Sequence, residues 1–119
     1  MSTHLRNSGE FQRVYAFGKR YDGRLMTVFV LPNNLPYHRF GLTASRKAIG
    51  NAVERNRSKR LLREVFRLSQ MELDRLPLKY DWVLNARRSL LGVKVMTPLE
   101  EFQRIIANAA SAAANGGKN

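Results

Sequence analysis

Cysteine is absent from this sequence, histidine occurs only twice, and acidic residues number nine in a chain of 119 residues. The absence of cysteine excludes a disulfide framework and a thiolate metal site. No apolar run approaches the roughly 20 residues of a membrane span. We also expect no signal peptide before the folded domain. We therefore expect a cytoplasmic protein without a membrane partner.

The shortage of acidic residues and histidines also bears on catalysis. Hydrolysis of a phosphodiester by protein side chains requires metal-binding carboxylates or a general acid and base. His4 and His38 fall in an expected tail and an expected turn, and no two carboxylates show a paired spacing. Helix positions account for five of the acidic residues, namely Glu10, Glu54, Glu64, Glu100 and Glu101. The sequence therefore indicates no catalytic residue and leaves metal binding open.

Positive charge is what the chain has in excess. Its 21 Lys and Arg residues give a net charge of +12. Such a charge indicates a polyanionic partner, either nucleic acid or an anionic membrane surface. The hydrophobic content of 44% is that of a folded globular protein. We expect a single domain over residues 1–119, with an ordered core at about 5–112 and a flexible end at 113–119.

Periodicity and helix caps predict the order α-β-β-α-β-α. Residues 1–7 are expected to be loose and residues 18–23 to form a basic loop. The expected elements are a helix from Ser8 to Gly18, strands at 24–31 and 39–45, a basic link at 45–50, a helix from Asn51 to about Gln70, a strand at 80–86 and a helix capped by Thr97.

These elements predict an α+β sandwich in which helices pack on one small mixed sheet. The short connection between strands 24–31 and 39–45 predicts an antiparallel hairpin. The helix between strands 39–45 and 80–86 predicts that these two strands pair in parallel, and general chirality favours a right-handed crossover. Trp82 is expected in the core.

The helix that begins after Asn51 separates two kinds of residue. Its apolar face gathers Leu61, Leu62 and Val65, with Ser58 on the same side. The opposite face carries Asn56, Arg60, Arg63 and Arg67, flanked by Arg57 and Lys59, whereas Arg55 lies at the margin of the buried stripe.

Residues 46–67 contain eight basic and two acidic residues, which is a net charge of +6 and half the charge of the whole chain. A solvated helix face usually mixes charges at i,i+4 spacing. Here Arg60, Arg63 and Arg67 repel one another unless an anion lies between them, and guanidinium groups bind phosphate in forked geometry. The pattern favours nucleic-acid contact over a solvated face.

The same stretch resembles the signature of the bacterial ribonuclease P protein family. The matching residues are the run from Lys47 to Val53, then Arg55-Asn56-Arg57, Lys59-Arg60 and Arg63-Glu64. The resemblance extends from about Leu5 to Ile106. It implies a left-handed rather than a right-handed β-α-β crossover, which we adopt as the expectation.

The resemblance also implies a function. In this family the catalytic RNA subunit, with bound Mg²⁺, removes the 5′ leader of precursor tRNA, and the protein assists without needing a protein partner. By position, the implied contacts to the RNA subunit are Arg46, Lys47, Arg55, Asn56, Arg57, Lys59, Arg60, Arg63 and Arg67. The implied cleft for the single-stranded leader contains Phe11, Tyr15 and Phe29.

The residues alone leave the role of the aromatic side chains open. Phe11 and Tyr15 at i,i+4 on a short helix are more often plain core, whereas the resemblance favours a leader-binding role for Tyr15 and Phe29 and a partly core role for Phe11. Unpaired bases stack on aromatic rings with little sequence demand.

Other classes of function stay open as well. The main alternative is a ribosomal or other structural RNA-binding protein without a role in tRNA processing. A DNA-binding regulator would need a second recognition helix or a dimer interface, and neither is evident. A protein-only nuclease would need the carboxylate cluster that the sequence lacks.

Overall fold

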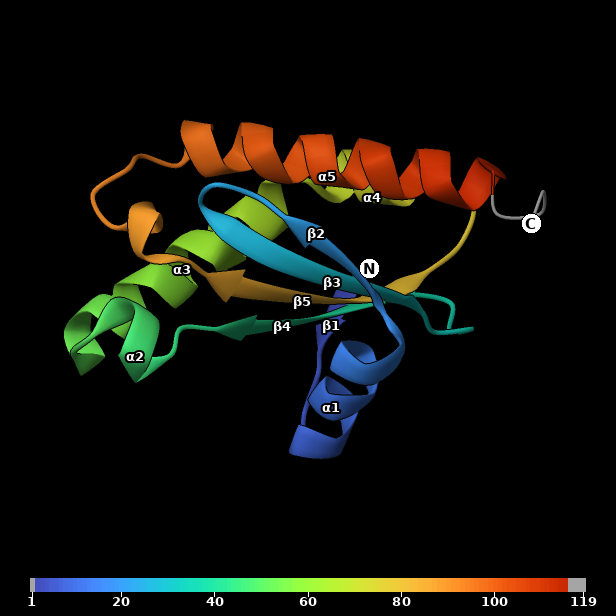
Figure 1. Cartoon of the computed structure of the whole chain (residues 1–119). Coiled ribbons are helices and arrows are strands. Elements are labelled where there is room, and N and C mark those ends of the chain that lie inside the picture. Colours follow the sequence, from blue (N-terminus) through green and yellow to red (C-terminus); the bar gives the residue numbers. More distant parts are fainter. Residues whose placement is uncertain (1, 116–119) are drawn as a thin grey trace.

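The computed structural model describes residues 2–115 and contains one five-stranded mixed sheet with helices on both faces (Figure 1). The α+β class predicted from the sequence is confirmed. None of the helices in residues 2–115 has the length and apolar character needed to cross a membrane. In chain order the elements are β1 (Ser2–His4), α1 (Ser8–Phe17), β2 (Lys19–Asp22), β3 (Met26–Pro32), β4 (His38–Thr43), α2 (Arg46–Ile49), α3 (Ala52–Leu68), α4 (Gln70–Asp74), β5 (Tyr80–Ala86), the 3-10 helix η1 (Arg88–Leu90) and α5 (Met96–Asn115).

The strand order is β1-β4-β5-β3-β2, and β5 is the central strand. The predicted parallel pairing of β4 with β5 is confirmed, but the predicted hairpin of β3 with β4 is wrong. Strand β5 lies between them and pairs with β3 in antiparallel fashion. Six of its seven residues are buried, because the central position covers both faces of this strand and pairs both of its edges.

Two edge strands, β1 and β2, were not predicted. Strand β1 pairs in parallel with β4, and β2 pairs in antiparallel fashion with β3, so the expected loose start and basic loop are wrong for these residues. Both strands are short and polar, and backbone pairing at a sheet edge needs no hydrophobic pattern. Leu5, which follows β1, is buried and donates its N–H to the carbonyl of Phe40 at 2.8 Å.

The observed starts and ends of the helices differ slightly from the predicted ones. Asn7 rather than Ser8 caps α1, and it forms a capping box with Glu10. The expected link at 45–50 contains the single helical turn α2, capped by Ser45. Helix α5 begins at Met96, one residue before the expected cap. It continues to Asn115. Two predictions concern residues outside the described ones: the loose start at Met1 and the flexible end at residues 116–119.

The two faces of the sheet carry separate cores. On one face, α3, α4 and α5 enclose the larger core around Trp82, Phe66 and Phe102. On the other face, α1 buries Val14 against Val83 of β5 (Figure 1). The strand predicted at 80–86 and the core position of Trp82 are confirmed, and the neighbouring Val83 belongs to the other core.

A network of charged residues fixes α1 to the sheet. The guanidinium group of Arg39 donates to both carboxylate oxygens of Asp81 at 2.8 and 2.7 Å, and to Glu10 of α1 at 2.7 Å. The backbone N–H of Arg6 is the main cause that holds the pKa of Glu10 below 4.5, with smaller contributions from the N–H of Asn7 and from Arg39. Helix α1 is thus held at a defined place over the sheet.

Candidate nucleic-acid interface

Helix α3 presents the basic residues because of how it begins and what it buries. Asn51 caps the helix by accepting from the N–H of Glu54 at 2.9 Å. Gly50 before it has a φ of +108°, a conformation that favours glycine. The buried stripe contains Ser58, Leu62, Val65 and Phe66, and the ring of Phe66 stacks on Phe40 of β4 with centroids 4.4 Å apart. Burial of this stripe turns the opposite face outward.

We call the outward residues of α2 and α3 the basic surface. It contains the exposed residues Arg46, Lys47, Asn56, Arg57, Arg60, Arg63 and Arg67, with Arg55 and Lys59 half-buried at its margin. The structure therefore exposes seven of the nine residues named from the sequence. Arg55 lies where the sequence put it, and its Nε atom is buried without a hydrogen-bond partner among the described residues.

The acidic residues near the basic surface neutralise only one of its arginines. Glu64 forms an exposed, two-pronged ion pair with Arg67, at 2.8 and 2.6 Å. This hydrogen bonding lowers the pKa of Glu64. No carboxylate in residues 2–115 pairs with Arg57, Arg60 or Arg63. Three guanidinium groups on successive turns of α3 are thus open to an anionic ligand.

The other candidate site lies on the opposite side of the sheet, beside α1. The register places Phe29, Val83 and Gly41 in one row across β3, β5 and β4. Helix α1 covers this row, and the ring of Phe11 lies directly over Gly41, where any Cβ atom would collide with it. The absence of a side chain at Gly41 lets Phe11 pack against the strand, so Phe11 is largely a core residue here.

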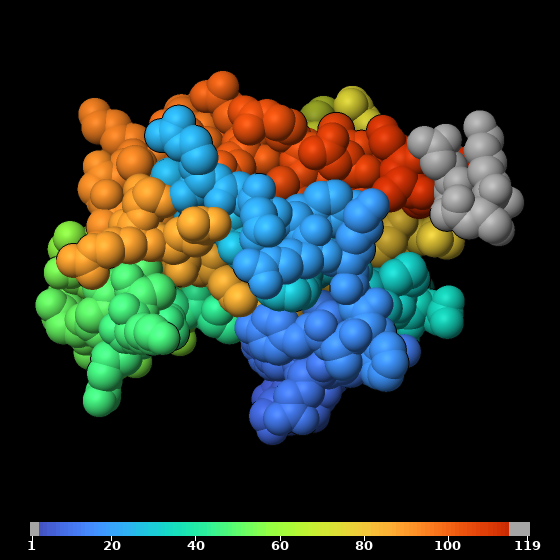
Figure 2. Space-filling view, viewed as in Figure 1, coloured from blue at the N-terminus to red at the C-terminus, as the bar shows by residue number. Residues whose placement is uncertain are grey.

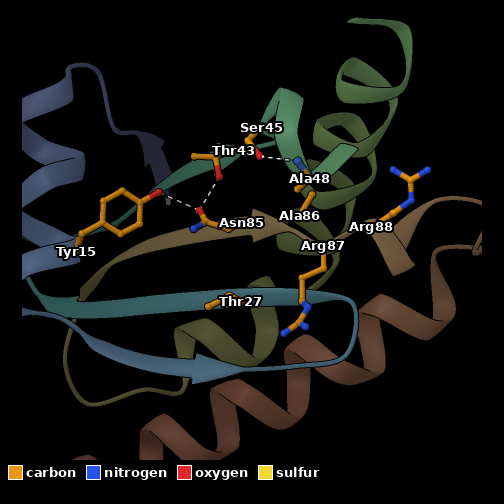
Figure 3. A pocket seen from close by; sticks show the side chains of 9 residues that line it. All are labelled: Tyr15, Thr27, Thr43, Ser45, Ala48, Asn85, Ala86, Arg87 and Arg88. Carbon is orange, nitrogen blue, oxygen red and sulfur yellow. Dashed lines mark hydrogen bonds between the residues drawn. The ribbon is translucent and has the colours of Figure 1, made fainter. Parts of the chain in front are cut away.

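The next row of the same sheet face is not covered by α1. It consists of Thr27, Asn85 and Thr43, which are neighbours across β3, β5 and β4. Above it lies a groove of about 510 Å³. Figure 2 shows a hollow between the blue α1 region and the green region of α2 and α3. The residues that line the groove are Tyr15, Thr27, Thr43, Ser45, Ala48, Asn85, Ala86, Arg87 and Arg88 (Figure 3).

Asn85 lies at the centre of the groove floor. Its Oδ1 atom accepts hydrogen bonds from the hydroxyl of Tyr15 at 3.0 Å and from Oγ1 of Thr43 at 2.6 Å. Figure 3 shows these two side chains reaching Asn85 from different elements, α1 and β4. The floor is therefore polar and ordered.

Aromatic rings form the α1 side of the groove. Tyr15 is 39% exposed, and its ring meets Phe29 edge to face with centroids 4.8 Å apart. Phe29 is half-buried, and the guanidinium carbon of Arg20 lies 5.7 Å from its ring centroid. Of the three aromatic residues named from the sequence, Tyr15 lines the groove and Phe29 supports it.

The polar floor of the groove was not predicted from the sequence. Thr27, Thr43 and Asn85 become neighbours only through the strand order, which was predicted with β5 at the wrong place. One signal was available: Asn85 follows three apolar residues of the strand, and asparagine is unfavourable within strands. Arg87 and Arg88 follow this strand directly, and their position on the groove rim could not be foreseen.

A protein-bound metal site has no support in the side chains that the structure describes. Within residues 2–115, no group of three or more His, Cys, Asp or Glu residues could hold a metal ion. The interface combines cationic, aromatic and amide groups, which suit binding of a nucleic acid.

Comparison with known proteins decides the family. The family model for Ribonuclease P matches residues 1–110. The chain belongs to the ribonuclease P protein family. It is 38% identical over 104 residues to the ribonuclease P protein component of Caldanaerobacter subterraneus subsp. tengcongensis, covering 87% of this chain and 86% of that protein. A second ribonuclease P protein component, from Pelotomaculum thermopropionicum, is 36% identical over 105 residues and covers 88% of this chain and 90% of its own length.

Solved structures of the ribonuclease P family share the fold. The RNase P protein from Thermotoga maritima matches with a TM-score of 0.75 and 28% identity, over 87% of this chain and 94% of that chain. The Staphylococcus aureus RNase P protein matches with a TM-score of 0.74 and 26% identity, over 89% of this chain and 94% of that chain. Members of this family are protein components of an endoribonuclease that processes tRNA.

Proposed function

We propose that this chain is the protein subunit of a bacterial ribonucleoprotein in which a catalytic RNA subunit removes the 5′ leader of precursor tRNA. The chain binds the RNA subunit through the basic surface and the leader through the groove beside α1. The observation that carries the proposal is the arrangement of two different binding surfaces around α2, one cationic and one aromatic with a polar floor. The cytoplasm is the expected location.

The basic surface suits a folded RNA. Arg57, Arg60 and Arg63 project from successive turns and have no acidic partner among residues 2–115, so phosphate groups relieve their mutual repulsion when they bind. Lys47 and Arg46 on α2 extend the charge toward the groove, because Ala48 and Ser45 of the same segment line it. A single RNA assembly can therefore contact both surfaces.

The groove suits a single strand of variable sequence. The ring of Tyr15 offers a stacking surface, which any unpaired base can use. Arg88 on the rim is exposed and available to the phosphate backbone, and the exposed Arg87 has further donors besides the Nη1 that donates to the carbonyl of Gly23 at 3.3 Å. Helix α1 and helix α2 flank the hollow, so the leader would run between them over the sheet (Figure 2).

The hydrolytic chemistry is assigned to the RNA subunit, which would hold most of the Mg²⁺ and would thereby supply an activated water. The described side chains support this division of labour, since they include cationic and aromatic groups at the interface but no carboxylate cluster. The chain's own contribution is to bind and orient the precursor and to neutralise phosphate repulsion in the assembled particle.

The decisive experiment is precursor-tRNA cleavage at low Mg²⁺ with three samples: the chain alone, a bacterial ribonuclease P RNA alone, and both together. We expect mature 5′ ends only, or much faster, when both are present. Cleavage by the chain alone would place an active site in the protein. No stimulation, with folded protein and active RNA, would instead support a structural RNA-binding protein.

A further inference from the structure

The amide group of Asn85 on the groove floor has no role in the function proposed so far. Two hydroxyl donors at the floor, from Tyr15 and Thr43, point to the same oxygen of Asn85, whereas the hydroxyl of Thr27 donates to Asp22. With two donors bound, Oδ1 has little capacity left for a ligand. The amide nitrogen Nδ2 has no hydrogen-bond partner within residues 2–115, and the residue is only half-buried.

We propose that Asn85 is a specificity-determining residue of the groove: its amide nitrogen donates a hydrogen bond to an acceptor atom on the edge of one leader base. Tyr15 and Thr43 act as positioning residues, because their hydroxyl groups fix which side of the amide faces the ligand. This inference rests on the proposed function, in that it takes the occupant of the groove to be the single-stranded leader of precursor tRNA.

The surroundings of Asn85 favour a base over a phosphate as its partner. Arg87 and Arg88 line the same groove and carry full charges, so they bind phosphate more strongly than a neutral amide does. A base that stacks against the ring of Tyr15 directs its polar edge away from the ring face, toward a neighbouring polar group. The nearest such group on the floor is the amide that Tyr15 itself orients.

The conformational preference of the strand does not explain why this residue is asparagine. The preceding row of the same sheet face uses Val83 at the equivalent place on β5, and a β-branched residue suits a strand better than asparagine does. Placing an amide between Thr27 and Thr43 is therefore unfavourable for the strand itself. A ligand contact at the open row accounts for this choice.

The test uses the holoenzyme reconstituted from this chain and a bacterial ribonuclease P RNA, with precursor tRNAs that carry each of the four bases at each leader position in turn. We expect one leader position at which the bases differ in apparent affinity by about fivefold, the effect of one hydrogen bond. Asn85→Leu should abolish this difference and leave the other positions as they were. The matched control is Asn108→Leu, since Asn108 is exposed on α5, on the other face of the sheet.

A base analogue identifies the contact atom. At the sensitive position, a deaza base that replaces the acceptor ring nitrogen by C–H should weaken binding to the unmodified protein by about fivefold. The same replacement should have no effect with Asn85→Leu. Tyr15→Phe, which removes the positioning hydroxyl but keeps the ring, should retain part of the discrimination.

Two results would overturn the assignment of Asn85. One is an equal loss of affinity for all leader bases in Asn85→Leu, matched by Tyr15→Phe, which would mean that Asn85 only supports Tyr15. The other is undiminished base discrimination in Asn85→Leu. With either result the affinity of the unmodified holoenzyme still depends on the leader, whereas failure of the proposed function itself would appear as an affinity that does not depend on the presence of a leader.

Discussion

The imidazole of His38 accepts a hydrogen bond from the indole N–H of Trp82, with 3.0 Å between Nδ1 and Nε1. The same nitrogen also accepts from the backbone N–H of Tyr80 at 3.0 Å. Nε2 lies 3.1 Å from the carbonyl of Leu73, so it carries the proton and donates. His38 thus links β4, β5 and α4 in its neutral form, and both of its nitrogens are used.

Acidification should therefore destabilise the fold through His38. Burial is the main cause that lowers the pKa of His38 below 6.5 in the folded state. The unfolded chain then binds this proton at a higher pH than the folded chain, so the free energy of unfolding falls as the pH falls below about 6.5. Denaturant unfolding followed by Trp82 fluorescence, between about pH 7.5 and 5.5, measures the slope.

The control for this prediction is His38→Asn. The amide oxygen of asparagine can accept near the position of Nδ1 but does not titrate. We expect this variant to be less stable at neutral pH, because it loses the bond to Leu73, and to show a flatter pH dependence over the same range. An equally steep decline in the variant would assign the effect to other groups.

Glu101 should contribute to stability far more than its neighbour Glu100. Its buried carboxylate accepts from three successive backbone N–H groups, those of Arg24, Leu25 and Met26, at 2.7, 3.0 and 3.1 Å. Glu101→Gln replaces one accepting oxygen by a donor, and we expect a loss of about 2 kcal/mol in the free energy of unfolding. Glu100→Gln, on the exposed side of the same helix turn, should change it by less than about 0.5 kcal/mol. Equal effects in denaturant titrations would refute this role.

The case of Glu101 shows what the sequence could and could not predict. Its place in the first turn of a helix suggested a dipole interaction, whereas its partners lie more than 70 residues away in the chain. Local signals succeeded where periodicity and caps suffice, as for strand 80–86 and the cap at Asn51. They failed for β1 and β2, whose stability comes from pairing with a neighbouring strand.

The candidate interface also has one part that local sequence signals predict and one part that they do not. The basic surface follows from helical spacing within one segment, so its residues could be named in advance. The groove floor depends on β5 entering between β3 and β4, which brings Asn85 beside Thr27 and Thr43. No residue spacing in the sequence indicates that these three residues are neighbours. The incorrect prediction of a hairpin between β3 and β4 also excluded the observed position of β5 between them.

The open arginines of the basic surface should differ from the paired one in their effect on RNA binding. Arg60→Ala should lower affinity for the RNA subunit by roughly 1 kcal/mol, about fivefold, and reduce the slope of log affinity against log salt by about one. Arg67→Ala should have a smaller effect, because Glu64 already neutralises part of its charge. Arg104→Ala, which removes an exposed charge from α5, is the control. Filter binding at several salt concentrations measures these differences, and identical salt slopes for all three variants would exclude a defined contact surface.

The aromatic wall of the groove should act only on substrates that carry a leader. Stacking contributes about 1–3 kcal/mol per base in single-strand binding. Tyr15→Ala should therefore reduce the affinity of the holoenzyme for precursor tRNA by about tenfold and leave its affinity for mature tRNA unchanged. Phe17→Ala provides a matched control, because Phe17 is on the same helix and is 76% exposed but does not line the groove.

The comparison of precursor with mature tRNA separates loss of a contact from loss of the fold. A misfolded variant would bind both RNAs poorly, whereas loss of stacking removes only the advantage of the leader. Tyr15→Phe keeps the ring that meets Phe29 and should retain most of that advantage, since it removes only the hydroxyl that Asn85 accepts. Equal losses in Tyr15→Ala and Phe17→Ala would mean that α1 contributes to leader binding through its charge or stability and not through a ring on the groove.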